Sequence, residues 1–286
     1  MLNCQICSYQ TDSPSDRDLG KAHGNTERFK ETFFQLWKCP RCQTIYTLGE
    51  VDFSDIYKDY PLNKRQLDMF AKGSLGNLLK YLRKFGLKKN HSILDYGCGN
   101  GIFVQFLKKH GYLNVRGFDP YVPEFSLEPG NEQFDYVVLN DVIEHSPLPR
   151  LLIQDCKNKL KSDGILYIVT VSSGGVEMHN LESHIWALHL PFHRIIMNKK
   201  SLEKLCSEQG LELIKSYTRS YIDTLKPFIN SRFLEEFNKA LGNSLDKAFE
   251  PASVKILFKK PILFFYGFFG YLFPTPDKLT VILKKD

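Results

Sequence analysis

The sequence contains no apolar run long enough to cross a membrane. A spanning helix needs about 18 or more apolar residues in a row, whereas the nearest approach, residues 261–273 (PILFFYGFFGYLF), has only thirteen. The N-terminus also lacks the basic and apolar segments of a signal peptide, because it is polar and contains Cys4 and Cys7. We therefore expect a cytoplasmic protein.

Long blocks of basic residues are also missing. The chain of 286 residues has a formal net charge of +6 and a pI near 8.8, which permits binding to an acidic surface. No run of lysine and arginine resembles a nucleic-acid-binding arm, so nucleic acid is not the expected partner. Hydrophobic residues make up 43% of the chain. This is sufficient for the core of one medium domain with an appendage, or of two small domains.

Four of the seven cysteines form two pairs with metal-ligand spacing. Two residues separate Cys4 from Cys7 and Cys39 from Cys42, and 31 residues lie between the pairs. Such spacing lets one tight turn place both thiolates on one metal, so two pairs predict a tetrahedral zinc site. Disulfides are disfavoured in a chain without an export signal. Because four thiolates fill the coordination sphere, we expect a structural zinc ion in a zinc ribbon over residues 1–50.

Residues 93–101 (ILDYGCGNG) predict a buried strand followed by a glycine-rich turn. Asp95 lies near the end of the strand, and Gly97, Gly99 and Gly101 form the turn. Glycine allows positive φ and the close approach of a ligand. The turn differs from the dinucleotide fingerprint, because the third glycine comes one residue early and an acid precedes the first. An acid repels a pyrophosphate, so the turn favours a ligand with a cationic head, such as S-adenosylmethionine.

This segment closely resembles motif I of the class I S-adenosylmethionine-dependent methyltransferases, and three further pieces follow in that family's order. They are residues 115–119 (VRGFD), residues 134–145 (FDYVVLNDVIEH), and the helix, turn and strand expected over residues 151–171. The resemblance implies that Asp119 binds the ribose hydroxyls of the cofactor. The full set of cofactor-binding residues that it implies is Asp95, Gly97, Cys98, Gly99, Gly101, Asp119, Pro120, Asn140, Asp141 and Val142.

The order of elements predicts a doubly wound, Rossmann-like α/β sheet over residues 91–221, because strands and helices alternate there. A helical connector over residues 51–90 precedes it, and an insertion with the final strand follows over residues 222–286. Only fourteen residues separate Asp119 from Phe134. A full helix and third strand need more, so we expect a loop there, which leaves the adenine pocket unassigned.

The insertion is rich in aromatic residues. Residues 222–278 lie between the sixth strand, expected over residues 211–217, and the last, expected over residues 279–283, where relatives often have a short hairpin. Within them, residues 254–273 combine aromatics with Lys255, Lys259 and Lys260. Three interpretations are open: a cap on the active site, a patch that contacts a membrane or a lipid-linked substrate, or a helix buried against the sheet or in a dimer interface. We favour the buried helix. The oligomeric state is not predicted.

Candidate catalytic residues follow two strands. Methyl transfer is an in-line displacement, so an enzyme must position the acceptor and remove its proton. His145 and Glu144 lie beyond the carboxyl end of a strand, where ligands bind in open α/β sheets, and histidine suits a general base. His193 and His189 lie within residues 182–194 (ESHIWALHLPFHR), a region that covers the acceptor in relatives.

Two further features near the expected site have alternative interpretations. Asp141, Glu144 and His145 resemble the metal site of quinone O-methyltransferases, which leaves a divalent ion open. Tyr57 and Tyr60 precede the connector helix, where they either close over the site or serve packing.

The combination of a Cys4 ribbon and this core resembles the zinc-ribbon methyltransferases of sugar and natural-product biosynthesis. It implies an S-adenosylmethionine-dependent methyltransferase. Because C-methylating relatives continue into a further large domain, we expect methylation at oxygen or nitrogen of a small molecule, a sugar or a glycan-linked group. Two alternatives are an RNA methyltransferase and a cofactor-binding module with a degenerate core. Against the first, Asn140 is followed by Asp141 and not by the proline that is typical of amino-group methylation on bases.

Overall fold

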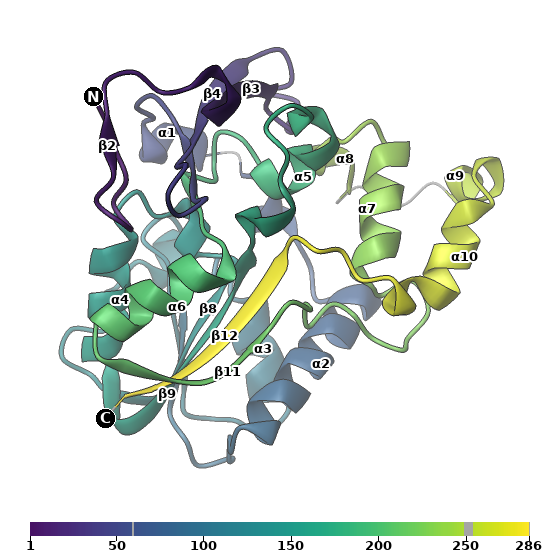
Figure 1. Cartoon of the computed structure of the whole chain (residues 1–286). Helices are drawn as coiled ribbons and strands as arrows, with labels where there is room; N and C mark the ends of the chain where they lie inside the picture. The colour runs from purple at the N-terminus through teal and green to yellow at the C-terminus, as the bar shows by residue number, and fades with distance from the viewer. Residues whose placement is uncertain (59, 249–253, 286) are drawn as a thin grey trace.

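A six-stranded sheet forms the centre of the computed structural model, which describes residues 1–58, 60–248 and 254–285 (Figure 1). The strand order is β11-β12-β9-β8-β6-β7. Parallel pairing joins β6 (Ile93–Tyr96), β7 (Val115–Phe118), β8 (Phe134–Asn140) and β9 (Leu160–Val171), whereas β12 (Lys278–Lys285) runs antiparallel between β9 and β11 (Leu211–Tyr217). The predicted α/β sheet is confirmed.

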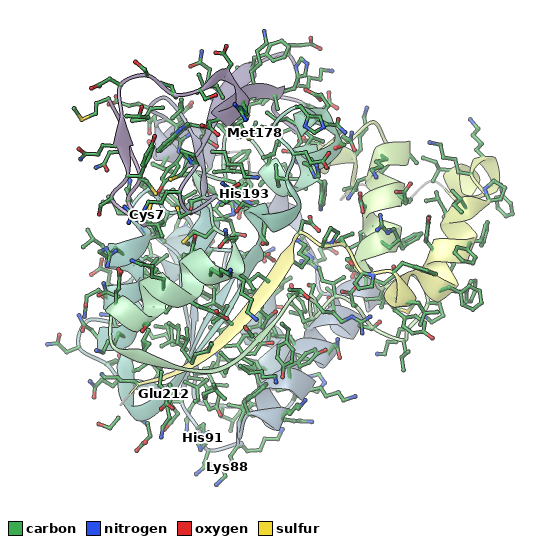
Figure 2. All side chains as sticks on the ribbon, in the orientation of Figure 1. Cys7, Lys88, His91, Met178, His193 and Glu212 are labelled. Atoms are coloured by element: carbon green, nitrogen blue, oxygen red, sulfur yellow. The ribbon has the colours of Figure 1, made fainter. Side chains whose placement is uncertain are left out.

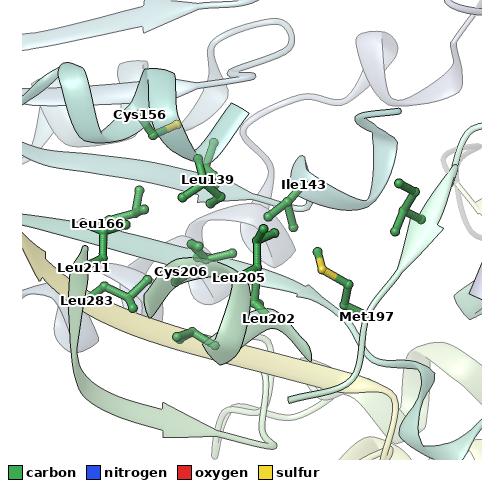
Figure 3. Close-up of a cluster of buried hydrophobic side chains, with 14 of the residues drawn as sticks. Leu139, Ile143, Cys156, Leu166, Met197, Leu202, Leu205, Cys206, Leu211 and Leu283 are labelled. Carbon is green, nitrogen blue, oxygen red and sulfur yellow. The ribbon is translucent and has the colours of Figure 1, made fainter. Parts of the chain in front are cut away.

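Helices bury both faces of the sheet, and successive residues of a strand point to opposite faces. Leu94 and Val137 pack with side chains of α4 (Pro149–Asn158) and α6 (Lys199–Glu208), whereas their neighbours Ile93 and Val138 pack with α2 (Met69–Lys84) and α3 (Ile102–Lys109). Figure 3 shows the first cluster, in which strand side chains meet those of the two helices: Leu139, Leu166, Leu211, Leu283, Cys156, Leu202, Leu205 and Cys206.

Several expected elements are present close to their predicted bounds. The strand predicted over residues 211–217 is β11, and Gly86 and Gly210, which follow α2 and α6, have φ values of +91° and +68°. Between β7 and β8 there is only the short turn η3 (Pro123–Phe125), as the count of fourteen residues predicted. Helix α4 begins at Pro149, two residues before its predicted start, because proline has the backbone angle of a first helical turn.

The N-terminal residues form two small sheets. One pairs β1 (Leu2–Asn3) with β2 (Gln10–Thr11). The other has the order β10-β5-β4-β3 and contains β3 (Leu19–His23), β4 (Phe33–Lys38), β5 (Ile45–Thr47) and β10 (Ile195–Ile196). Strand β10 comes from the segment after β9, so the later chain completes this sheet. Trp37 and Tyr46 also belong to the same buried cluster as Ile143 and Met197.

The insertion lies beside the sheet and does not cover it (Figure 1). It contains α7 (Ser231–Ala240), α8 (Leu245–Ala248), α9 (Val254–Lys259), α10 (Ile262–Phe269) and η7 (Gly270–Leu272); residues 249–253 of the predicted insertion lie outside the described residues. Within the chain, α10 packs on α7 through the buried Leu263, whereas Phe265 and Phe269 are about half exposed. The favoured interpretation, a helix buried against the sheet or in a dimer interface, stays a prediction. Among the helices described, none has the length and apolar character needed to cross a lipid bilayer.

Candidate active site

A cavity of about 360 Å³ lies at the carboxyl ends of β6, β7 and β8. The strand-to-helix loops open at this edge of a parallel sheet, which is where ligands bind. Its volume is within the range of small-molecule sites. Figure 2 shows His193 and Cys7 at this end of the molecule, whereas Lys88, His91 and Glu212 lie at the opposite end.

The glycine loop between β6 and α3 forms one wall of the cavity. Gly97 and Gly99 line it with φ values of +76° and +53°. A Cβ at Gly97 would lie 2.6 Å from Val142, which follows β8, so only glycine lets the two strand ends approach this closely. Gly101 lies behind the loop, where a Cβ would meet the ring of Phe125 at 2.3 Å. Gly101, named from sequence as a cofactor-binding residue, is not among the lining residues of the cavity, and its missing side chain makes room for that ring.

Two carboxylates flank the glycine loop. Asp119 follows β7, and its Oδ2 accepts a hydrogen bond from the amide of Gly99 at 2.9 Å, while its Oδ1 accepts from the amide of Tyr121 at 2.9 Å. These bonds fix the carboxylate at the cavity wall. Asp95 lines the same wall and is 3% exposed. Burial, with a smaller contribution from the charge of Asp119, raises the pKa of Asp95 to about 7.

The raised pKa of Asp95 predicts that the unliganded protein loses stability as pH rises. The side chain titrates near 3.8 in the unfolded chain and at about 7 in the folded protein. Between these values the folded state binds more protons, so the free energy of unfolding falls with rising pH and levels off above the folded pKa. Between about pH 5 and about pH 8, we expect the free energy of unfolding of Asp95→Asn to fall by about 2 kcal/mol less than that of the wild type. Urea unfolding at several pH values measures it. An unchanged pH slope in this variant would contradict the expectation, and Asp16→Asn on the surface is the control.

The connector closes the cavity with aromatic side chains. Tyr57 follows α1 (Phe53–Ile56), and its ring stacks on that of Tyr121 with centroids 4.5 Å apart and an interplanar angle of 13°. The side-chain amide of Asn100, in the glycine loop, donates to the backbone carbonyl of Arg65. The connector is therefore tied both to the glycine loop and to the loop after β7.

Tyr57 and His145 form a hydrogen-bonded pair on the cavity wall. The hydroxyl of Tyr57 lies 2.6 Å from Nδ1 of His145. Burial lowers the pKa of His145 to about 4, and a hydrogen bond to the backbone of Phe192 acts in the opposite direction. Burial also raises the pKa of Tyr57 well above its ordinary value. Both side chains are thus neutral near neutral pH, and the Tyr57 hydroxyl donates to the imidazole ring.

His189 and His193 are buried behind this wall and are not among the lining residues. Nε2 of His189 lies 3.0 Å from the hydroxyl of Tyr60, which does line the cavity, and Nδ1 lies 2.7 Å from Oδ1 of Asn25. Nδ1 of His193 donates to the carbonyl of Ala187 at 2.7 Å. Of the predicted catalytic histidines, the structure therefore brings only His145 to the cavity itself.

Glu144 is fully buried beside these histidines. Its Oε2 accepts a hydrogen bond from Thr170 at 2.8 Å, whereas Oε1 has no hydrogen-bond partner in the described part of the chain and lies 4.0 Å from Nε2 of His193. Burial, then the charge of Asp141, raises the pKa of Glu144 to about 8. Donor atoms of Glu144, His145 and His193 lie within 4.8 Å of one another and could hold a metal ion. This set contains His193 in place of the Asp141 named from sequence.

The four cysteines of the two N-terminal pairs converge. Their Sγ atoms lie within 4.8 Å of one another, with 3.4 Å between Cys4 and Cys42 and 3.6 Å between Cys7 and Cys39. Tetrahedral zinc with Zn–S bonds of about 2.3 Å places the sulfurs about 3.8 Å apart, and a disulfide requires about 2.05 Å. The spacing fits a shared metal. Each pair is followed by a residue with a left-handed backbone, since Ser8 and Gln43 have φ values of +58° and +62°. The two pairs therefore end in turns of the same type.

Comparison with known proteins decides the family. A model of the methyltransferase domain family matches residues 67–216, just over half of the chain. The chain belongs to the methyltransferase domain family. Ubiquinone biosynthesis O-methyltransferase of Glaesserella parasuis serovar 5 is 30% identical over an alignment of 106 positions, covering 28% of this chain and 45% of that protein. EEF1A lysine methyltransferase 2 of Mus musculus is 38% identical over 50 positions, covering 18% and 20%. The chain thus spans less than half the length of these curated relatives.

Solved structures share the fold of this methyltransferase domain. A candidate sarcosine dimethylglycine methyltransferase from Galdieria sulphuraria has a TM-score of 0.51 at 13% identity, covering 82% of this chain and 99% of that one. Phosphoethanolamine N-methyltransferase 2 from Haemonchus contortus has a TM-score of 0.50 at 15% identity, covering 96% and 70%. Together with the family match, they identify a class I S-adenosylmethionine-dependent methyltransferase fold. The family match, over residues 67–216, does not extend to the N-terminal cysteines.

Sequence reasoning missed several residues of the site. Tyr121 and Tyr221 line the cavity, and the hydroxyl of Tyr221 accepts from the side-chain amide of Asn140 at 3.0 Å. Lys278 begins β12; burial lowers its pKa, but the charges of Asp141, Asp277 and Glu144 outweigh burial and raise it. Only the antiparallel direction of β12, which places the start of this strand at the ligand edge, could have indicated Lys278.

Proposed function

We propose that the protein is an S-adenosylmethionine-dependent methyltransferase that acts on oxygen or nitrogen of a small molecule, a sugar or a glycan-linked group. One observation supports this most strongly: a single cavity is lined both by the glycine loop with Asp119 and by the Tyr57–His145 pair. Methylation at oxygen is the preferred alternative, because a curated relative is named as an O-methyltransferase.

The cofactor side of the cavity would be formed by the residues predicted from motif I. The carboxylate of Asp119 retains acceptor capacity beyond its two amide bonds and would accept from the ribose hydroxyls. Asp95 would face the cationic head, whose charge stabilises the ionised carboxylate. Other lining residues would contact the rest of the cofactor: Gly97, Cys98, Gly99, Pro120, Asn140, Asp141 and Val142.

The acceptor side would remove a proton. When bound, S-adenosylmethionine supplies the methyl group and the sulfide leaving group. Tyr57 would take the proton of the acceptor oxygen as its own proton passes to Nδ1 of His145. The hydrogen bond from His145 to the backbone of Phe192 favours the resulting imidazolium. Glu144, His189 and His193 would act from behind the wall by holding His145 and Tyr60 in position.

The N-terminal cysteines would hold a structural zinc ion. Cys4, Cys7, Cys39 and Cys42 supply four soft ligands with compatible sulfur separations. Reduced cysteines that bind a metal fit a cytoplasmic location. The ion would stabilise the sheet in which β5 pairs with β10, directly after His193. It would take no part in methyl transfer.

Asp119→Ala is expected to weaken cofactor binding by about 100-fold or more, because two charge-assisted hydrogen bonds to the ribose are lost. Calorimetric titration of the zinc-loaded protein with S-adenosylmethionine and S-adenosylhomocysteine measures this, with Asp16→Ala on the surface as the control. A folded wild type that binds neither compound would overturn the proposal in favour of a degenerate core. Acceptors are then screened among nucleotide sugars, glycans and phenols. Co-purifying nucleic acid with strongly salt-dependent affinity would instead favour an RNA methyltransferase.

A further inference from the structure

Helix α10 is apolar on all sides, but the protein buries only one of them. The sequence of Ile262–Phe269 is ILFFYGFF. Leu263 is fully buried and packs in a cluster with Phe233 and Phe237 of α7. Gly267 allows the closest approach, because a Cβ there would lie 2.4 Å from the ring of Phe228. Packing on α7 and the preceding loop therefore explains one side of the helix and leaves the opposite side unexplained.

The opposite side, with neighbouring residues of α9 and η7, exposes a group of large apolar side chains, most of them phenylalanine, which we call the aromatic patch. Phe258 is 73% exposed and the other members are between 45% and 56% exposed. Ile262, Phe265 and Phe269 follow helical spacing, and the ring of Phe265 lies 5.4 Å from that of Phe269 and 6.2 Å from that of Phe273. Clustered exposure of this kind marks an interaction surface. The patch consists of Phe258, Ile262, Phe265, Phe268, Phe269, Leu272 and Phe273.

The segment that contains the aromatic patch carries charge of one sign. Residues 254–273 contain three lysines and no aspartate or glutamate. Lys259 and Lys260 are exposed, and neither forms an ion pair within residues 1–58, 60–248 and 254–285. Anionic phospholipid headgroups complement such lysines, while aromatic side chains enter the boundary between headgroups and acyl chains. An isologous contact with a second copy would instead bring like charges together.

The position of the patch suits contact with a planar surface. Helices α9 and α10 lie at the periphery of the molecule, beyond α7 and away from the sheet (Figure 1). We propose that the aromatic patch docks this protein on an anionic lipid surface, with its phenylalanine rings inserted and Lys259 and Lys260 against the phosphates. The proposal goes beyond methyl transfer and does not depend on it.

Vesicle co-sedimentation of the full, zinc-loaded chain tests the proposal. Vesicles of phosphatidylcholine alone are compared with vesicles containing equal amounts of phosphatidylcholine and phosphatidylglycerol. We expect binding to the anionic vesicles, and we expect it to weaken as salt is added. The double variant Lys259→Ala/Lys260→Ala is expected to lower binding to them by about 30-fold, because each lysine near an anionic surface contributes about fivefold.

The aromatic contribution is tested separately. Phe265→Ser/Phe269→Ser is expected to lower binding at least about tenfold, whereas Leu113→Ser/Leu127→Ser, which changes two exposed leucines outside the patch, leaves it unchanged. Melting temperatures show whether each variant folds. If the phenylalanine double variant does not fold, the lysine double variant still tests the proposal. Failure of the wild type to sediment with anionic vesicles would overturn the proposal. So would a dimer that the phenylalanine variant dissociates while vesicle binding is unaltered.

Discussion

Replacement of Cys39 by serine is expected to lower the free energy of unfolding by more than about 5 kcal/mol, because loss of one thiolate removes most of the binding free energy of a structural zinc ion. Cys39 is fully buried and belongs to the same cluster as Trp37, Tyr46 and Met197. The N-terminal sheet and the adjoining part of the main core should therefore lose stability together. Thermal unfolding, with zinc content measured by elemental analysis, checks this result.

A matched control separates the loss of metal from the cost of a buried hydroxyl. Cys206 is equally buried, on α6, and lies outside the cysteine group. Cys206→Ser should cost only about 1–3 kcal/mol and leave the zinc content unchanged. A strong chelator should destabilise the wild type and the Cys206 variant alike, with little further effect on the Cys39 variant. Wild-type protein that contains no zinc and melts with the Cys39 variant would show that the cysteines hold no structural ion.

Replacement of His145 by glutamine is expected to lower kcat by about 10²- to 10⁴-fold, the usual contribution of general acid–base catalysis. Affinity for S-adenosylmethionine should stay close to that of the wild type, because the proposal assigns His145, a lining residue, to the acceptor and not to the cofactor. Tyr57→Phe should lose a similar factor, since in the proposed mechanism the hydroxyl transmits the proton. Both are measured with the acceptor found by screening, alongside calorimetric titration of the cofactor. His179→Ala, on the surface, is the control.

The pH dependence of the rate follows from the low pKa of His145, and the variants distinguish a role in proton transfer from a merely structural one. With the pKa of His145 at about 4, the imidazole is already neutral at about pH 5, so protonation of this residue should not reduce the wild-type rate above that pH. Tyr57→Phe with an unaltered kcat would show that His145 contacts the acceptor directly. Unaltered kcat in both variants would exclude the pair from proton transfer.

The parts of the site that are local in sequence were predictable. The glycine loop lies within residues 93–101, directly after the strand β6, so recognition of that strand also fixes the position of the loop. The absence of a strand between β7 and β8 followed from a count of residues, because fourteen cannot form a helix and a strand. Local patterns also placed the two cysteine pairs, since their spacing encodes the turn that directs the sulfurs.

The remaining contacts depend on residues far apart in the chain, which no local pattern encodes. Asn25 is 164 positions from His189, the residue it contacts, and Tyr57 is 88 positions from His145. Pairing of β10 with β5 is likewise invisible in the sequence, because β10 is two residues long. The sequence offers the residue types for these contacts, but only the packed fold selects the partners.

The pairing of β5 with β10 has a consequence for how this protein can be divided. The backbone carbonyl of His193 accepts a hydrogen bond from Thr47, and that of Arg194 accepts from the amide of Thr47. The wall behind His145 is thus built jointly from the first fifty residues and from the segment after β9. Truncation at residue 50 would not release an autonomous catalytic fragment, and grafting the cysteine module onto another methyltransferase would leave β5 without its partner.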